Sequence, residues 1–245
     1  MPRVNVKTGK KKGVVAYLWK FAGKFSVIEV EHILVAWVIL SLAFTFVLYG
    51  FAVNNVIFLL VFSASLIVLG CGFIMHELMH KFTAQKFRYK AEFRIWPLGI
   101  MLALITSLFG FIFAAPGATY FEPDPREQYM DPKGFTKRYG IISFAGPKIN
   151  LIFGFIFISL FFLTRLVFPQ VTSLGIAFAL LVTGLGAFIN FYLAAFNLLP
   201  LGSGWLALDG YKVLHWNKMY WVSSFAIAAA MSIVSYIYVI PYIVI

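Results

Sequence analysis

Charged side chains are scarce in this 245-residue chain, since Asp, Glu, Lys and Arg make up 12% of it and hydrophobic residues make up 62%. With a mean hydropathy of +0.90, this composition excludes a soluble globular protein and indicates a polytopic membrane protein. Cysteine occurs once, as Cys71, which excludes an internal disulfide. A mass of 27.6 kDa leaves room for one membrane domain.

Acidic residues are scarcer than basic ones, with nine Asp and Glu against 20 Lys and Arg and a net charge of +11. The cations lie in loops between apolar runs, as the positive-inside rule requires, so we predict a bilayer setting and no nucleic-acid partner. The first 24 residues carry seven Lys and Arg, no acid and no evident small-residue cleavage site. We therefore predict a basic cytoplasmic N-terminal tail over residues 1–28 and a single transmembrane domain over residues 29–245.

Long apolar runs predict transmembrane helices at 32–51, 56 to about 81, 139–168, 173–197 and 220–240. A further apolar segment, 98–115, contains proline and glycine. If it crossed the bilayer, the cation-bearing segment 122–138 would lie outside. If it re-enters, that segment lies in the cytoplasm, which the positive-inside rule favours. We expect a re-entrant hairpin, with an ordinary sixth span as the alternative.

A short alternating stretch precedes that segment: Lys90, Glu92 and Arg94 alternate with Ala91, Phe93 and Ile95. Period-two alternation predicts a half-buried strand at the membrane surface. The expected fold class is an α-helical polytopic membrane protein. It has about five to six transmembrane helices, with a small membrane-associated β element and a re-entrant segment after the second helix.

Histidine is also rare, yet two of the four histidines, His76 and His80, flank Glu77 at the end of the second run. On a helix, both imidazoles project from one face roughly 6 Å apart along the axis, as two ligands of one zinc should. Glu77 lies about 100° round the helix. Ionisable groups at membrane depth are costly and usually functional. The structural alternative is a histidine pair that caps helix carbonyls or lies among lipid headgroups.

The scarcity of acidic residues leaves one candidate for a third ligand, because Asp209 is the single acidic residue after Asp131. With a re-entrant 98–115 segment, Asp209 lies on the same side of the membrane as the histidine pair. Two histidines and one carboxylate leave the fourth zinc position open for water, as in catalytic sites. His215 is the rival ligand, and Asp before Gly is also turn or helix-cap chemistry.

These residues resemble the site-2 protease family of intramembrane zinc metalloproteases. The similar motifs are His-Glu-Leu-Met-His at residues 76–80, Leu208-Asp209-Gly210, Ala115-Pro116-Gly117 and Gly146-Pro147-Lys148-Ile149-Asn150. The resemblance implies a multi-pass protein of the cell membrane that cleaves a membrane-embedded substrate helix, so residues 29–245 would be a protease domain. It also implies His76, His80 and Asp209 as zinc ligands and Glu77 as catalytic base.

The expected chemistry is attack on the scissile carbonyl by a zinc-bound water, with Glu77 as general base. The substrate, a transmembrane protein, must unwind locally. The strand at 90–95 is expected to offer an unpaired edge on which the substrate adds as a further strand, with Phe93 as a contact. Asn150 is expected to hydrogen-bond the substrate backbone or a zinc-ligand histidine. Asn197 is expected to contact substrate or to cap its helix.

Two other functional classes are consistent with a metal motif in a membrane helix: a metal-ion transporter and a non-catalytic zinc-binding membrane adaptor. A transporter should carry further polar residues across the bilayer, whereas residues 56–75 contain no ionisable side chain except Cys71. An adaptor would not need Glu77. Both observations favour the protease.

Overall fold

The computed structural model describes residues 25–50, 55–112, 116–202 and 207–242. Five of its helices are long and apolar enough to cross a membrane, which confirms the expected fold class. They are α2 (Val27–Tyr49), the run Val56–Lys86, α7 (Pro132–Val167), α8 (Leu174–Asn197) and α10 (Lys218–Tyr238), with the short turn η3 (Ile240–Tyr242) after α10. Even α10, with 21 residues, is about 32 Å long and matches a hydrocarbon core of about 30 Å.

Two helices begin earlier than expected from hydropathy. Helix α2 starts at Val27, inside the predicted tail, because the Ser26 side chain accepts a hydrogen bond from the Glu29 N–H. Helix α7 starts at Pro132 because the Asp131 side chain accepts from the Gly134 N–H and proline suits the first helical turn. Polar caps, rather than the apolar run, therefore set both starts. Residues 1–24 of the predicted tail lie outside the described residues.

The second span consists of α3 (Asn55–Leu69), a π-helical segment η1 (Gly70–Ile74) and α4 (Met75–Lys86). The Met75 N–H bonds to the Gly70 carbonyl five residues back. Such π segments change the direction in which the following side chains point and often occur at functional sites. This one ends directly before His76.

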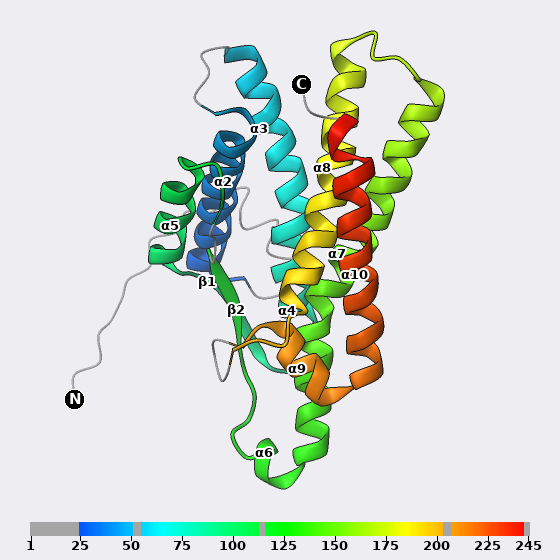
Figure 1. Cartoon of the computed structure of the whole chain (residues 1–245). Helices are drawn as coiled ribbons and strands as arrows, with labels where there is room; N and C mark the ends of the chain where they lie inside the picture. The colour runs from blue at the N-terminus through cyan, green and yellow to red at the C-terminus, as the bar shows by residue number, and fades with distance from the viewer. Residues whose placement is uncertain (1–24, 51–54, 113–115, 203–206, 243–245) are drawn as a thin grey trace, which may run out of the picture.

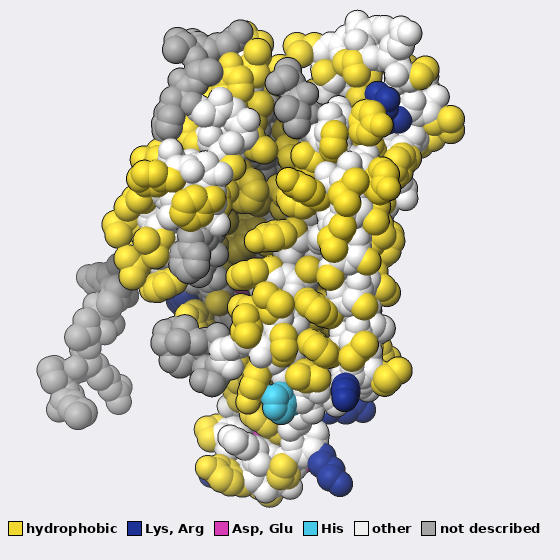
Figure 2. Space-filling model, in the orientation of Figure 1, with side chains coloured by type: hydrophobic (Ala, Val, Ile, Leu, Met, Phe, Trp, Pro, Cys, Tyr) yellow, Lys and Arg dark blue, Asp and Glu magenta, His cyan; other side chains and the backbone are white. Residues whose placement is uncertain are grey.

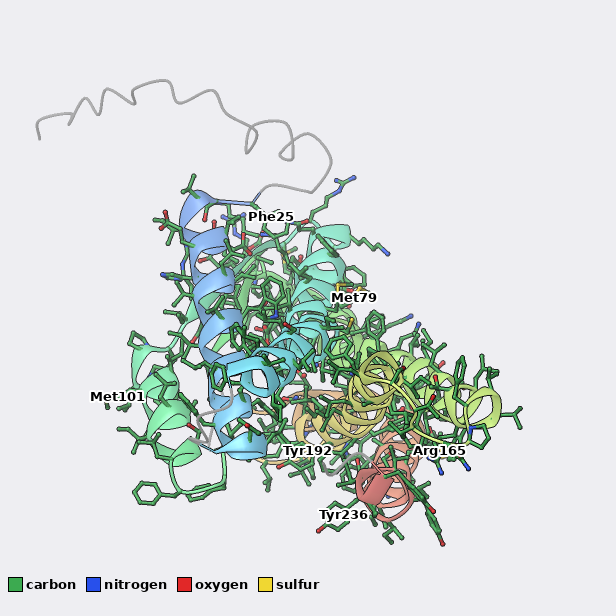
Figure 3. The ribbon with its side chains drawn as sticks, turned by 90° about the horizontal axis from the view of Figure 1, so that it is seen from above. Phe25, Met79, Met101, Arg165, Tyr192 and Tyr236 are labelled. Atoms are coloured by element: carbon green, nitrogen blue, oxygen red, sulfur yellow. The ribbon has the colours of Figure 1, made fainter. Side chains whose placement is uncertain are left out.

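Helix α8 lies centrally, packed against α7, α10 and α3, while α2 packs between α3 and the short helix α5 (Pro97–Ser107). Viewed from above, Met101 of α5 lies on the outer side of α2, away from Tyr192 and the other helices (Figure 3). Close packing of α7 on α8 depends on small residues. A Cβ at Gly154 would lie 2.6 Å from the Phe191 ring, and one at Gly186 would lie 2.6 Å from the Phe157 ring.

The predicted strand is confirmed as β1 (Lys90–Ile95), which pairs antiparallel with β2 (Gly117–Glu122). In this ladder Ile95 lies opposite Gly117. The intervening segment therefore returns to the level that it left. Its helix α5 has 11 residues, about 16 Å, which is too short to cross the bilayer. The described residues of this segment therefore contain no sixth span, with residues 113–115 outside the described part of the chain, and its re-entry into the bilayer stays a prediction.

The second edge of β1 is closed by side chains. The Phe93 N–H donates to Glu29 Oε1 (2.9 Å), the Ile95 N–H donates to His32 Nδ1 (3.3 Å), and Lys81 Nζ donates to the Ala91 carbonyl (2.8 Å). Lys81 Nζ also lies 2.6 Å from Glu29 Oε2, and both side chains are buried. The expectation of an unpaired β1 edge is therefore wrong, because α2 and α4 supply its partners.

Polar elements gather at one end of the bundle, where α6 (Glu127–Met130) and α9 (Asp209–Trp216) lie. Figure 2 shows hydrophobic side chains over most of the visible face, with most of the visible Lys and Arg side chains near this lower end. Arg138 pairs there with Glu127 (2.9 Å) and Asp131 (3.2 Å). On this face, the distribution is that of an apolar belt with a basic end.

Candidate metal centre

His76 and His80 project from the same face of α4, as their spacing predicts. Their Nε2 atoms are 3.0 Å apart and their ring centroids are 4.6 Å apart. Both side chains are buried. Two imidazoles that meet at their Nε2 atoms can bind a single metal ion between them.

Asp209 reaches this pair from α9, more than a hundred residues away in the sequence. Its Oδ2 atom lies 3.3 Å from His76 Nε2 and 3.1 Å from His80 Nε2, and its side chain is 13% exposed. The three ligand atoms lie within 4.8 Å of one another. Gly210 allows this approach, because a Cβ there would lie 2.0 Å from the Leu198 carbonyl oxygen. The structure thus brings together all three residues expected to hold zinc.

The far nitrogen of each imidazole has its own partner. His76 Nδ1 lies 2.5 Å from Asn150 Oδ1, and His80 Nδ1 lies 2.8 Å from the Ile142 carbonyl oxygen. Both partners on α7 accept hydrogen bonds, so each Nδ1 carries a proton and Nε2 is the nitrogen that can offer a lone pair to a metal. Of the two roles expected for Asn150, the structure shows the bond to a candidate ligand.

Helix α7 passes close to the centre at Gly146. A Cβ at this position would lie 2.4 Å from His80 Nε2 and 2.6 Å from His76 Nε2. Glycine therefore keeps open the space in front of the two nitrogens. Two imidazole nitrogens, one carboxylate oxygen and an open approach fit a zinc ion with a fourth position for water.

The charge of Asp209 suits the same site. Burial opposes its ionisation, but in the metal-free site the two histidines beside it, His80 foremost, favour the carboxylate when they are protonated and hold the pKa of Asp209 below its usual value. A carboxylate that stays ionised is the form that binds a cation.

Glu77, the expected base, lies one residue from His76 and is 8% exposed. Its Oε2 atom accepts a hydrogen bond from the Thr119 N–H (2.7 Å), and the Thr119 hydroxyl donates to the Glu77 carbonyl oxygen (3.1 Å). These two bonds join β2 to α4. Thr119 lies opposite Phe93 in the ladder, and the Phe93 N–H points away from β2 towards Glu29. The two residues are therefore a non-hydrogen-bonded pair of the antiparallel ladder. In such a pair the Thr119 N–H also points away from the partner strand, here β1.

The remaining candidates lie apart from the three ligand atoms. His215 is exposed and its Nδ1–H donates to the Tyr211 carbonyl (2.7 Å), so it is not part of the ligand group. Asn197 ends α8 and its amide donates to the Leu193 carbonyl (2.9 Å), one turn back in the same helix; its contact with substrate stays a prediction. Phe93 is buried in the core edge-to-face with Phe73 (5.8 Å), so its side chain is a core residue.

Two residues of the site were not expected from the sequence. Thr119 lies in strand β2, and nothing in the neighbouring sequence distinguishes it from an ordinary strand residue. Asn190 lies in the apolar helix α8 and accepts a hydrogen bond from Asn150 (3.0 Å). An amide at membrane depth is an informative signal, and it could have singled out Asn190.

A protein of Methanocaldococcus jannaschii named "Putative zinc metalloprotease MJ0611" is 38% identical to this chain over 187 residues. The match covers 75% of this chain and 82% of that protein. No family model and no solved structure matches the chain. The relative's name and the three converging ligand atoms confirm the expected zinc cofactor. The separate roles of His76, His80, Asp209 and Glu77 stay predictions.

Proposed function

The chain belongs to the zinc metalloprotease family of its Methanocaldococcus relative, and from this we propose that it is an intramembrane protease of the site-2 type. Its substrate would be a membrane protein, cut at a peptide bond in or near a transmembrane helix. The zinc site would face the cytoplasm, with the N-terminus on the same side.

The observation that carries this proposal is where the ligand group lies. His76 and His80 belong to an apolar helix run, Val56–Lys86, that is long enough to cross a membrane. Asp209 joins them from α9, so a polar catalytic group is enclosed by membrane helices rather than attached to a soluble domain. Ionisable residues at such a depth are rarely kept without function.

The chain's own residues can perform the chemistry of peptide hydrolysis. When bound, zinc supplies a Lewis acid that polarises the scissile carbonyl and makes water acidic enough to attack at neutral pH. Glu77 accepts the proton of the attacking water and returns it to the departing amine. The Thr119 N–H holds one carboxylate oxygen of Glu77 in place. Gly146 leaves the approach to the imidazoles open.

A helical substrate must become extended before it can be cut, and an extended peptide can add to a sheet edge. The β1 edge is occupied by Glu29, His32 and Lys81. The outer edge of β2 faces Glu77 instead, and among the described residues Glu77 alone bonds its backbone. We therefore place the substrate strand beside β2 rather than beside Phe93.

The decisive experiment uses purified Glu77→Gln protein, a transmembrane substrate and zinc analysis. A protease loses cleavage but keeps its zinc, because glutamine has the shape of glutamate and cannot accept the proton. Glu77→Asp, which shortens the side chain and keeps the carboxylate, is the matched control and should retain partial cleavage. If Glu77→Gln cleaves as fast as the wild type, the proposed role of Glu77 is wrong. If the protein were a transporter, Glu77→Gln would still carry metal ions across the membrane. If it were an adaptor, Glu77→Gln would still bind both zinc and its partner protein.

A further inference from the structure

Two asparagines lie in series behind His76. Asn150 on α7 and Asn190 on α8 are both 0% exposed. Asn150 Nδ2 donates to the Gly72 carbonyl (2.9 Å) and to Asn190 Oδ1 (3.0 Å), and Asn190 Nδ2 donates to the Gly186 carbonyl (2.9 Å). The bonds form a continuous series: the Gly186 carbonyl of α8 accepts from Asn190, Asn190 accepts from Asn150, and Asn150 accepts from His76 at the metal centre.

The direction of each amide follows from its fixed ends. The carbonyls of Gly72 and Gly186 belong to the backbone and can only accept, so each asparagine must turn its NH₂ group towards its carbonyl. Asn190 then presents Oδ1 to Asn150. Asn150 has both N–H groups occupied and presents Oδ1 to His76 Nδ1, 2.5 Å away. An acceptor at that position requires a proton on Nδ1.

We propose that Asn190 is a positioning residue of the metal centre, which acts through Asn150 to hold His76 in the Nδ1–H tautomer with Nε2 turned towards the metal. The inference rests on the proposed function only in taking zinc as the ion bound by His76. It needs no assumption about the substrate.

A comparison of the two histidines explains why a second asparagine is needed. His80 donates to the Ile142 carbonyl, which the α7 backbone already holds in place. His76 donates to a side-chain amide, which can rotate by itself. Asn190 and Gly72 each take one N–H of Asn150 and prevent that rotation. The chain therefore uses two side chains for His76 where one backbone carbonyl serves His80.

The first test reads the tautomer directly, by ¹⁵N NMR of histidine-labelled, metal-free protein that carries Asp209→Ala, so that no carboxylate competes for a proton on Nε2. With Asn190 in place, neutral His76 should be protonated at Nδ1. In Asn190→Leu on the same background, a large part of the His76 signal should move to the Nε2–H form while His80 stays unchanged. The matched control is Thr183→Val, a change on the same helix at a hydroxyl that donates to the Ala179 carbonyl (2.6 Å). An unchanged His76 tautomer in folded Asn190→Leu would overturn the proposal.

The second test is a double-mutant cycle on zinc affinity, measured by chelator competition. Loss of an outer partner of a metal-binding histidine typically weakens binding by about 10- to 100-fold. Asn150→Leu and Asn190→Leu should each reduce affinity in this range. The double variant should be no weaker than Asn150→Leu, because Asn190 acts through Asn150. Losses that multiply would show that Asn190 acts independently, which contradicts the proposal.

Asn190→Ala repeats both measurements with a smaller side chain, in case leucine prevents folding. If the wild type binds no zinc, the proposed function fails. The tautomer of metal-free His76 still decides the role of Asn190 in that case. If zinc binds and His76 keeps its tautomer in the folded leucine or alanine variant, the role of Asn190 fails and the protease proposal stands.

Discussion

Replacing Gly146 with alanine should disrupt the metal centre through a single methyl group. A Cβ there would lie 2.4 Å from His80 Nε2 and 2.6 Å from His76 Nε2, about 1 Å short of ordinary contact. Helix α7 or the imidazoles must therefore move by about that distance. Misplacement of about 1 Å in a catalytic group can cost on the order of 10²-fold in rate, so we expect a loss of that size in kcat/KM, with weakened zinc binding.

Gly154→Ala is the matched control, eight residues further along α7. Its Cβ would lie 2.6 Å from the Phe191 ring, so the steric conflict is similar but distant from the ligand atoms. Overpacking costs about 1–3 kcal/mol, and both variants should lose thermal stability in detergent. Only Gly146→Ala should lose zinc, as measured by metal analysis after dialysis. Wild-type zinc content and cleavage in folded Gly146→Ala would refute this explanation of the glycine.

Three further predictions concern other parts of the site. Asp209→Ala should lose zinc in metal analysis, whereas His215→Ala should retain it, because only Asp209 faces the imidazoles. Lys81→Met leaves the buried Glu29 carboxylate without its cation and should lower the unfolding free energy by about 3–5 kcal/mol; a change below about 1 kcal/mol in denaturant titrations would contradict this. Thr119→Pro should slow cleavage with zinc retained, whereas Thr119→Val, which keeps the N–H, should cleave faster than the proline variant.

The metal ligands could be predicted from the sequence because each signal is local or rests on scarcity. His76 and His80 are four residues apart, and helix geometry alone puts them on one face. Asp209 is the single acidic residue after Asp131. Most limits of the five spans follow equally from apolar runs. The exceptions are the starts at the polar caps Ser26 and Asp131 and the end of the second span, which continues beyond residue 81 to Lys86.

The partners of these residues could not be predicted in the same way. Glu29 bonds the Phe93 N–H across 64 residues, and Asn190 bonds Asn150 across 40 residues. Such contacts depend on how helices pack, which local periodicity does not encode. The prediction of an unpaired β1 edge is wrong for this reason. Alternation identifies a strand, but it does not identify the side chains of other helices that bond its edge.

The predicted re-entrant hairpin and the metal centre depend on each other. Between His80 and Asp209 the chain crosses with α7 and returns with α8. The carboxylate therefore meets the imidazoles only if the segment before α7 makes no crossing of its own. The pairing of Ile95 with Gly117 meets that condition, and the same pairing places the Thr119 N–H on Glu77. A crossing at α5 would carry β2 and Asp209 to the opposite leaflet. The Thr119 N–H could then not bond Glu77, and Asp209 could not reach the two imidazoles.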